Sequence, residues 1–262
     1  MITRTLPDFD PDQIFTSGQT FRFKKLPDGC WSGVYKDRPL TLKTTGDETA
    51  FSDFDDDIVR YLDLDFDYGA LKKIYQSDET LSRAASACGG IRILRQDPFE
   101  ALISFIISQN NNIKRISKII ENIASKFGRP VGNGLFAFPE PLTLASAAES
   151  DFAALGAGYR ANYIKEAAEA VSSGAFDLNA IFSLDYETAK ARLMCLKGIG
   201  AKVADCVLLF GFAKKEAFPV DVWMKKVLSN YYPEGFPERF YDYRGVAQQY
   251  LFQYIRVLEN KV

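Results

Sequence analysis

A lysine and an aspartate nineteen residues apart are the side chains of this sequence best suited to covalent chemistry. Lys202 follows a Gly-Ile-Gly turn and lies in the first turn of a helix, which apolar residues at helical spacing predict. A lysine there opposes the helix dipole, which favours the neutral amine, and a neutral amine is a nucleophile. Asp221 stands where a Pro-Val dipeptide leads into another helix. A carboxylate there caps the helix or stabilises positive charge.

The turn before Lys202 is itself suited to binding a phosphate. Gly198 and Gly200 permit unusual backbone angles and a close approach of the main chain. The free N–H groups at the start of the next helix carry partial positive charge, so a hairpin over about residues 190–212 would bind a backbone phosphate. Taken singly, Lys202 reads as a surface lysine and Asp221 as a cap. Their combination favours chemistry.

Composition removes several classes of mechanism. The chain has 262 residues, enough for two or three sub-domains, and no histidine, which excludes Ser-His-Asp catalysis and histidine-ligated metals. Four cysteines, at positions 30, 88, 195 and 206, have neither metal spacing nor the pattern of a disulfide framework, which favours a reducing cytoplasm. No apolar run is long enough to cross a membrane, and the N-terminus does not read as a secretory signal.

The charge of the chain is distributed unevenly. The net charge of −2 gives no bulk attraction to nucleic acid. Residues 1–100 hold 13 Lys and Arg against 18 Asp and Glu, whereas residues 101–262 hold 19 against 16. A DNA-binding surface is therefore expected on the second part of the chain, as a local site.

Five separated blocks of sequence resemble the 8-oxoguanine DNA glycosylases, a branch of the helix–hairpin–helix and Gly/Pro-loop-aspartate superfamily. They are Ser-Gly-Gln-x-Phe-Arg from residue 17, Asn-Asn-Asn-Ile-x-Arg from 110, Gly-Tyr-Arg-Ala-x-Tyr from 158, Gly-Ile-Gly-Ala-Lys-Val-Ala-Asp-Cys from 198 with Pro-Val-Asp-Val from 219, and Ala-Gln-x-x-x-Phe from 247. The resemblance covers about residues 16–254, with the blocks in the family's order.

The resemblance implies an α+β fold. An N-terminal antiparallel sheet domain over residues 1–94, similar to half of a TATA-binding protein, would precede an all-helical glycosylase domain over residues 95–262. Residue patterns predict strands at 20–23, 31–35 and 40–42 and an acidic helical connector over 54–84, packed on the sheet. Later helices are expected at 99–107, 113–127, 142–153, 161–173, 184–195 and 243–259, the first of them apolar nearly all round and therefore buried.

The family's activity implies roles for individual residues. Lys202 would attack C1′ of a flipped nucleotide, expel 8-oxoguanine and form a Schiff base, and β-elimination would then nick the strand. Asp221 would stabilise the oxocarbenium charge and orient the nucleophile. The flipped base would be held by Cys206 and Phe252 on its faces, Gln248 at its Watson–Crick edge and the Gly18 carbonyl at N7–H.

A second group would contact the rest of the DNA. Asn110, Arg115 and Arg160 would hold the unpaired cytosine, whose acceptors suit arginine. Tyr159 would wedge into the stack, and Gly198 and Gly200 would hold the backbone.

Further implications concern cofactors and partners. The backbone carbonyls of Leu196 and Ile199 would hold a structural monovalent or divalent cation, and no cofactor would be required for catalysis. An iron–sulfur cluster is not expected, because no cysteine follows Cys206. The expected partner is double-stranded DNA containing 8-oxoguanine, bound by a monomer in the cytoplasm, associated with the nucleoid. No membrane association is expected.

The chain departs from its family at Trp223, where relatives commonly carry histidine. Indole donates one hydrogen bond but carries no charge, so two interpretations of Trp223 are open: it packs against neighbouring aromatic residues, which is favoured, or it replaces the family's polar contact by stacking against the flipped nucleotide. Two other functions remain open: a monofunctional glycosylase for alkylated bases, which would lack a lysine at 202, and a non-catalytic hairpin DNA-binding protein, which would need neither Lys202 nor Asp221.

Overall fold

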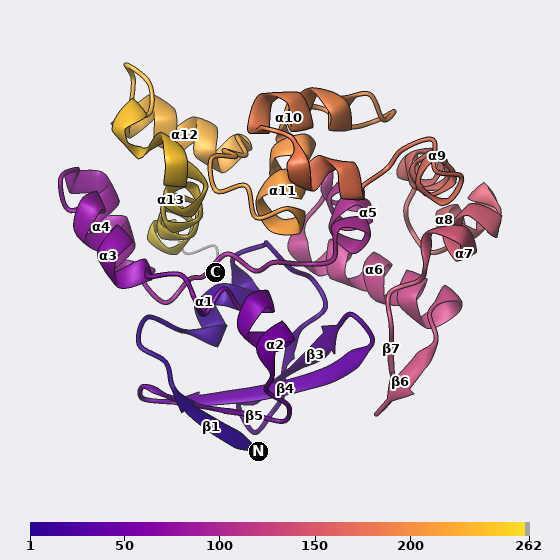
Figure 1. Ribbon diagram of the computed structural model, residues 1–262, viewed down its shortest axis with the longest axis horizontal. Coiled ribbons are helices and arrows are strands. Elements are labelled where there is room, and N and C mark those ends of the chain that lie inside the picture. The colour runs from indigo at the N-terminus through magenta and orange to yellow at the C-terminus, as the bar shows by residue number, and fades with distance from the viewer. Residues whose placement is uncertain (260–262) are drawn as a thin grey trace.

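The structure, a computed structural model, describes residues 1–259 and begins with an antiparallel sheet (Figure 1). Its five strands lie in the order β1-β5-β4-β3-β2. They are β1 Ile2–Thr5, β2 Lys24–Lys25, β3 Trp31–Tyr35, β4 Arg38–Thr45 and β5 Glu48–Phe51. Short turns join β3 to β4 and β4 to β5, with Lys36 and Gly46 at positive φ. The predicted antiparallel sheet is thus confirmed.

Helices make up most of the remaining chain, as the resemblance implied (Figure 1). They are α1 Pro11–Thr16, α2 Asp56–Tyr61, α3 Tyr68–Tyr75, α4 Glu79–Ala87, α5 Pro98–Ser108, α6 Ile113–Phe127, α7 Pro141–Ser146, α8 Glu149–Ala154, α9 Arg160–Ser172, α10 Tyr186–Met194, α11 Ala201–Gly211, α12 Val222–Tyr231 and α13 Arg244–Leu258, with 3₁₀ turns at Asn179–Ser183 and Glu238–Tyr243 and a small hairpin of β6 Pro130–Gly132 and β7 Leu135–Phe136.

Two hydrophobic cores hold these elements together. One lies under the sheet, where Phe15, Phe23 and Trp31 pack against one another. The other joins the helices around α5, whose residues 99–107 are all buried, as its apolar surface predicted. Helix α5 packs against α11, so the buried helix supports the one that carries Lys202.

The N-terminal part differs from prediction in two places. Residues 11–16 form a helix, α1, which Asp10 caps by accepting from the backbone N–H groups of Asp12 and Gln13. Residues 20–23 are not a strand, because this segment runs between the two cores. Phe21 packs into the helical core and Phe23 into the sheet core, so neither face of the segment is left for solvent.

The acidic segment 54–84 also differs from prediction. It forms three helices, and only α2 packs on the sheet, through Ile58 and Tyr61. Helices α3 and α4 instead join the helical core, where α4 packs against α13, the last helix of the chain. In the same way, the single helix expected over 142–153 is two helices, α7 and α8, because the chain is extended at residues 147 and 148.

A buried charge network links the sheet domain to the helices. The Arg22 guanidinium donates to the Glu121 carboxylate at 3.1 Å and to the Phe136 carbonyl, and it lies 3.9 Å from Glu100. Burial raises the pKa of Glu100 to about 7, although the positive charge of Arg22 opposes that rise. The folded protein therefore favours the protonated carboxyl.

Glu100 is expected to make the folded protein less stable as the pH rises. The pKa of Glu100 is higher in the folded protein than the ordinary 4.5, so binding of a proton by this carboxyl stabilises the fold. That stabilisation is complete below pH 4.5 and is lost as the pH rises through about 7. In wild type the free energy of unfolding should fall by about 3 kcal/mol over this pH range because of Glu100, and Glu100→Gln should remove that fall. Chemical denaturation at several pH values measures it, and Glu79→Gln, at an exposed site, is the control. Identical slopes in wild type and Glu100→Gln would refute the assignment.

Candidate active site

The hairpin is formed by α10, the turn that follows it and α11. The two helices are held by Asp205, which accepts from the Tyr186 hydroxyl at 2.6 Å and from Lys190 at 3.0 Å. In the turn Gly198 has φ +80, and a Cβ there would lie 2.5 Å from ring atoms of Tyr163. Only glycine fits this position. Gly200 starts α11 with no side-chain cap, which leaves the N–H groups of the first turn free for a ligand.

Lys202 lies in the first turn of α11, as predicted, and points back toward α5. Its Nζ donates to the Ser108 hydroxyl at 3.3 Å and lies 5.6 Å from the centre of the Phe105 ring. Ser108 in turn donates to the Phe105 carbonyl, so its hydroxyl is fixed. Ser108 was not singled out from the sequence, because nothing local distinguishes it from any serine at a helix end.

Asp221 caps α12. One of its carboxylate oxygens, Oδ1, accepts from the N–H groups of Trp223 at 3.0 Å and Met224 at 2.9 Å. The cap explains the local sequence, as expected from an aspartate at a helix start. It does not use the other carboxylate oxygen, and the same side chain also lines a cavity.

A cavity of about 50 Å³ brings together the two predicted catalytic residues and the four predicted base-binding residues. It is lined by Ser17, Gly18, Phe105, Lys202, Cys206, Phe210, Pro219, Asp221, Gln248, Gln249 and Phe252. These come from the segment after α1, from α5, α11 and α13, and from the loop before α12. The volume suits one or two waters. A base enters only if the lining side chains move.

The lining offers apolar and polar contacts suited to a flat heterocycle. Burial raises the pKa of the Cys206 thiol to about 11, so it is neutral and presents an apolar surface. Phe252 lies across from Gly18, whose φ is +77 and at which an added Cβ would lie 3.8 Å from the phenyl ring. Gln248 is buried, and its neighbour Gln249 was not predicted as a site residue.

The three consecutive asparagines between α5 and α6 have different structural roles. Asn112 caps α6 by accepting from the Arg115 N–H, and Asn111 donates to the Ile107 carbonyl. Asn110 has φ +45 and is exposed. Two of the three are thus accounted for by local structure, and Asn110 is left to face solvent.

The predicted opposite-base residues lie beside this loop. Tyr159 is 57% exposed, and Arg115 is exposed while donating to the Gly156 carbonyl at 3.3 Å. Arg160 is only 3% exposed: its guanidinium stacks on the Tyr159 ring and donates to the carbonyls of Gln109 and Asn110. The structure therefore places Arg160 beneath the asparagine loop. Its contact with a cytosine remains a prediction.

Trp223 lies at the start of α12, next to Asp221. It is partly buried against the helical core, and the Lys226 ammonium lies 4.6 Å from its ring centre. This agrees with a packing role for the indole, although the residue as a whole is only partly buried.

The cation predicted at the hairpin turn remains untested. The Leu196 carbonyl already accepts from the Ile199 N–H at 3.1 Å, and a carbonyl has a second lone pair available for a cation. Within residues 1–259 no cluster of three acidic or cysteine side chains could hold a metal. Any cation at this turn would depend on backbone oxygens.

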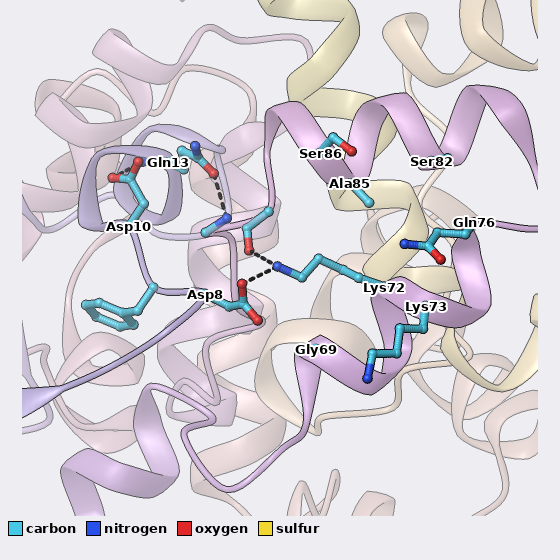
Figure 2. A pocket seen from close by; sticks show the side chains of 13 residues that line it. Asp8, Asp10, Gln13, Gly69, Lys72, Lys73, Gln76, Ser82, Ala85 and Ser86 are labelled. Carbon is cyan, nitrogen blue, oxygen red and sulfur yellow. Dashed lines mark hydrogen bonds and ion pairs between the residues drawn. The ribbon is translucent and has the colours of Figure 1, made fainter. Parts of the chain in front are cut away.

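A larger hollow of about 560 Å³ lies elsewhere, between the N-terminal segment, α3 and α4 (Figure 2). It shares no residue with the cavity at Lys202. Figure 2 shows Lys72 reaching the Asp8 carboxylate and the Gly89 carbonyl, so its ammonium is already paired within the fold. No predicted site residue lies there.

Comparison with known proteins decides the family. Residues 1–102 match the N-terminal domain of 8-oxoguanine DNA glycosylases, and residues 103–235 match the HhH-GPD superfamily of base excision DNA repair proteins. A probable N-glycosylase/DNA lyase of Methanothermobacter thermautotrophicus is 34% identical over 70% of this chain and 69% of its own length. The chain belongs to the 8-oxoguanine DNA glycosylase family. N-glycosylase/DNA lyase OGG1 of Arabidopsis thaliana is 30% identical over 91% of this chain and 75% of its own.

Solved structures of this glycosylase family have the same fold. An 8-oxoguanine glycosylase/lyase of Clostridium acetobutylicum, in complex with double-stranded DNA containing cytosine opposite 8-oxoguanine, gives a TM-score of 0.92 at 36% identity, over 99% of this chain and 95% of that one. A 3-methyladenine DNA glycosylase from Archaeoglobus fulgidus shares the fold alone, with a TM-score of 0.76 and 20% identity over 98% of this chain and 99% of that one. Within residues 1–259, no helix combines the length and apolarity required to span a bilayer.

Proposed function

We propose that this glycosylase excises 8-oxoguanine from duplex DNA and then cleaves the strand at the resulting abasic site. The observation that carries the proposal is the single cavity shared by Lys202, Asp221, Gly18 and the three side chains expected to hold the base. The sugar C1′ is out of reach inside a duplex, so the nucleotide would have to flip into this cavity.

The chemistry follows from the two catalytic side chains. The neutral amine of Lys202 attacks C1′, and the C1′–N9 bond breaks with its electrons leaving on the base. The Asp221 carboxylate stabilises the positive charge that develops on the sugar. Loss of a proton and opening of the sugar give a Schiff base between Nζ and C1′. Removal of a C2′ proton then expels the 3′ phosphate, which nicks the strand.

A monofunctional alkylated-base glycosylase is the alternative. Such an enzyme uses water as nucleophile and needs no lysine in the cavity, whereas here Lys202 lies in it together with Asp221. A duplex with one 8-oxoguanine opposite cytosine tests the proposal directly. Release of the oxidised base with strand nicking supports it. Release of 3-methyladenine from a second duplex that carries this base, with 8-oxoguanine left intact in the first, would favour the alternative.

Recognition of the lesion is proposed to depend on the Gly18 carbonyl. Guanine and 8-oxoguanine differ at N7, which is an acceptor in the first and a donor in the second. A fixed carbonyl rewards the donor, and an unpaired buried acceptor costs about 1–3 kcal/mol, which is roughly tenfold to a hundredfold in rate.

Gly18→Ala is expected to slow excision by roughly tenfold or more while duplex binding stays nearly the same. The residue has φ +77, so a methyl group strains the backbone by about 1–2 kcal/mol and crowds the base-binding space. The matched control is Gly174→Ala, which has φ +75 with no atom within 4 Å of the added Cβ and lies outside the cavity. Single-turnover excision measures the effect. Equal slowing in both variants would mean that strain alone is responsible.

Arg115 is proposed to read the base opposite the lesion. Wild type should act best opposite cytosine and worst opposite adenine. Arg115→Ala should relax that preference by roughly tenfold, because a good arginine–base contact is worth about 1–3 kcal/mol. The neighbouring exposed Lys114→Ala serves as the control. Excision rates opposite the four bases are the measurement, and a wild type indifferent to cytosine and adenine would contradict the proposal.

Two further points belong to the same proposal. The hairpin would bind the DNA backbone through its free N–H groups, helped by a cation at the carbonyls of Leu196 and Ile199, whose role would be structural. The enzyme would act as a monomer in the cytoplasm, close to the nucleoid.

A further inference from the structure

Gln249 lines the proposed base pocket and carries a buried oxygen that has no partner within residues 1–259. It lies on α13 beside Gln248, is 4% exposed and lines the same cavity as Lys202. Its Nε2 donates to the Gln248 Oε1 at 2.8 Å. Its own Oε1 is buried and accepts no hydrogen bond from the part of the chain between residues 1 and 259. Buried acceptors in native proteins are nearly always paired, so an unpaired one beside a ligand cavity points to a ligand donor.

The hydrogen bond between the two glutamines also fixes what Gln248 can offer. Because Gln248 Oε1 accepts from Gln249, the Nε2–H₂ group of Gln248 is the part of its amide left for a ligand. Turning one amide alone would set two oxygens or two NH₂ groups against each other, so the two amides are coupled. In the orientation that the structure shows, they offer one donor, from Gln248, and one acceptor, from Gln249.

The two purine Watson–Crick edges present their donors and acceptors in opposite order, so a donor and an acceptor at fixed positions match only one of them when N7 is held in place. A guanine-type edge has the O6 acceptor beside the N1–H and N2–H₂ donors, whereas an adenine-type edge has an N6–H₂ donor beside the N1 acceptor. We infer that Gln249 is a specificity-determining residue, whose Oε1 accepts a hydrogen from the N1–H or N2–H₂ group of the flipped base while Gln248 donates to O6. This inference rests on the proposed function, since it needs a base in this cavity.

The test compares 8-oxoguanine with 8-oxoadenine, each opposite cytosine. Both lesions carry the oxygen at C8 and the hydrogen at N7, so the contact with Gly18 stays constant and only the Watson–Crick edge changes. Gln249→Met keeps the length of the side chain and removes both hydrogen-bonding atoms. In single-turnover excision, its preference for 8-oxoguanine over 8-oxoadenine should be at least tenfold smaller than that of wild type.

A matched control comes from the next turn of α13. Gln253 is 3% exposed and bonds to Thr16 and Arg256, outside the cavity. Gln253→Met removes a buried amide from the same helix. It should cost stability and leave the preference between the two lesions unchanged. A merely structural role for Gln249 predicts the same outcome in both variants.

A second variant keeps the test decisive if Gln249→Met is too unstable to assay. In Gln249→Glu the carboxylate still accepts from the N1–H or N2–H₂ group of 8-oxoguanine, and it has no hydrogen to donate to the N1 acceptor of 8-oxoadenine. The preference for 8-oxoguanine should therefore be at least as large as that of wild type, in contrast to Gln249→Met.

The outcomes separate the inference from the function on which it rests. If wild type excises neither lesion, the proposed function is wrong. If wild type excises 8-oxoguanine, while Gln249→Met keeps the wild-type preference or Gln249→Glu loses it, then Gln249 does not read the base.

Discussion

Lys202→Gln is expected to abolish the covalent adduct that borohydride traps between the enzyme and 8-oxoguanine DNA. Glutamine has no nucleophilic amine, so neither the attack on C1′ nor the Schiff base can form. Excision should fall by several orders of magnitude, as removal of a covalent nucleophile does in other enzymes. Binding of the duplex should persist, because the hairpin N–H groups do not depend on this side chain.

The control for this experiment is Lys197→Gln. Lys197 lies in the hairpin turn, is exposed and pairs with Glu166 at 2.6 Å, outside the cavity. If the exposed lysine of the turn were the one that reacts, the adduct would disappear in Lys197→Gln and persist in Lys202→Gln. If Lys202→Gln still formed the adduct on a denaturing gel, the nucleophile would be another amine and the assignment would fail.

Asp221→Asn is expected to separate the two proposed roles of the aspartate, which are capping α12 and stabilising positive charge on the sugar. Asparagine caps a helix about as well as aspartate, so the free energy of unfolding should change by no more than about 1 kcal/mol. The loss of the carboxylate charge removes its stabilisation of the developing positive charge on the sugar. Single-turnover excision should therefore fall by roughly 10²–10³-fold, the usual scale for one preorganised electrostatic contact.

Two comparisons make this experiment decisive. Asp221→Ala removes the cap as well, which should cost about 1 kcal/mol more in thermal or chemical unfolding. Asp185→Asn alters the cap of α10, where the carboxylate accepts from the Thr188 N–H, and should leave excision at the wild-type rate. Near-normal excision by Asp221→Asn would leave the aspartate with the capping role alone.

The hairpin and the position of Lys202 in it could be predicted because their signals are local. Gly198 is required by the backbone angle and by the close approach of Tyr163, and the apolar spacing after Gly200 marks the helix directly. Asp221 likewise satisfies N–H groups only two and three residues away. The buried helix α5 was also predictable, because it is apolar nearly all round.

Other features depended on contacts that sequence spacing does not contain. Residues 20–23 alternate like a strand, yet they run between two cores, so Phe21 and Phe23 pack into different ones. Helices α3 and α4 pack with α13 because segments far apart in sequence lie side by side in the fold. Arg160 looks like an exposed cation in the sequence, and only the fold shows it buried under the asparagine loop.

The sequence by itself determined most of the helices, the hairpin and the family, and it singled out the two side chains proposed for catalysis, because helix starts, turns and caps are set by neighbours within a few residues. Only the tertiary structure decided which side chains share the cavity. It placed Gly18 and Phe252, from opposite ends of the chain, beside Lys202. It also buried Gln249 so that its Oε1 is left without a donor among the residues that the structure describes. Gly18, Phe252 and Lys202 meet because distant segments pack together, which contacts within a few residues do not specify.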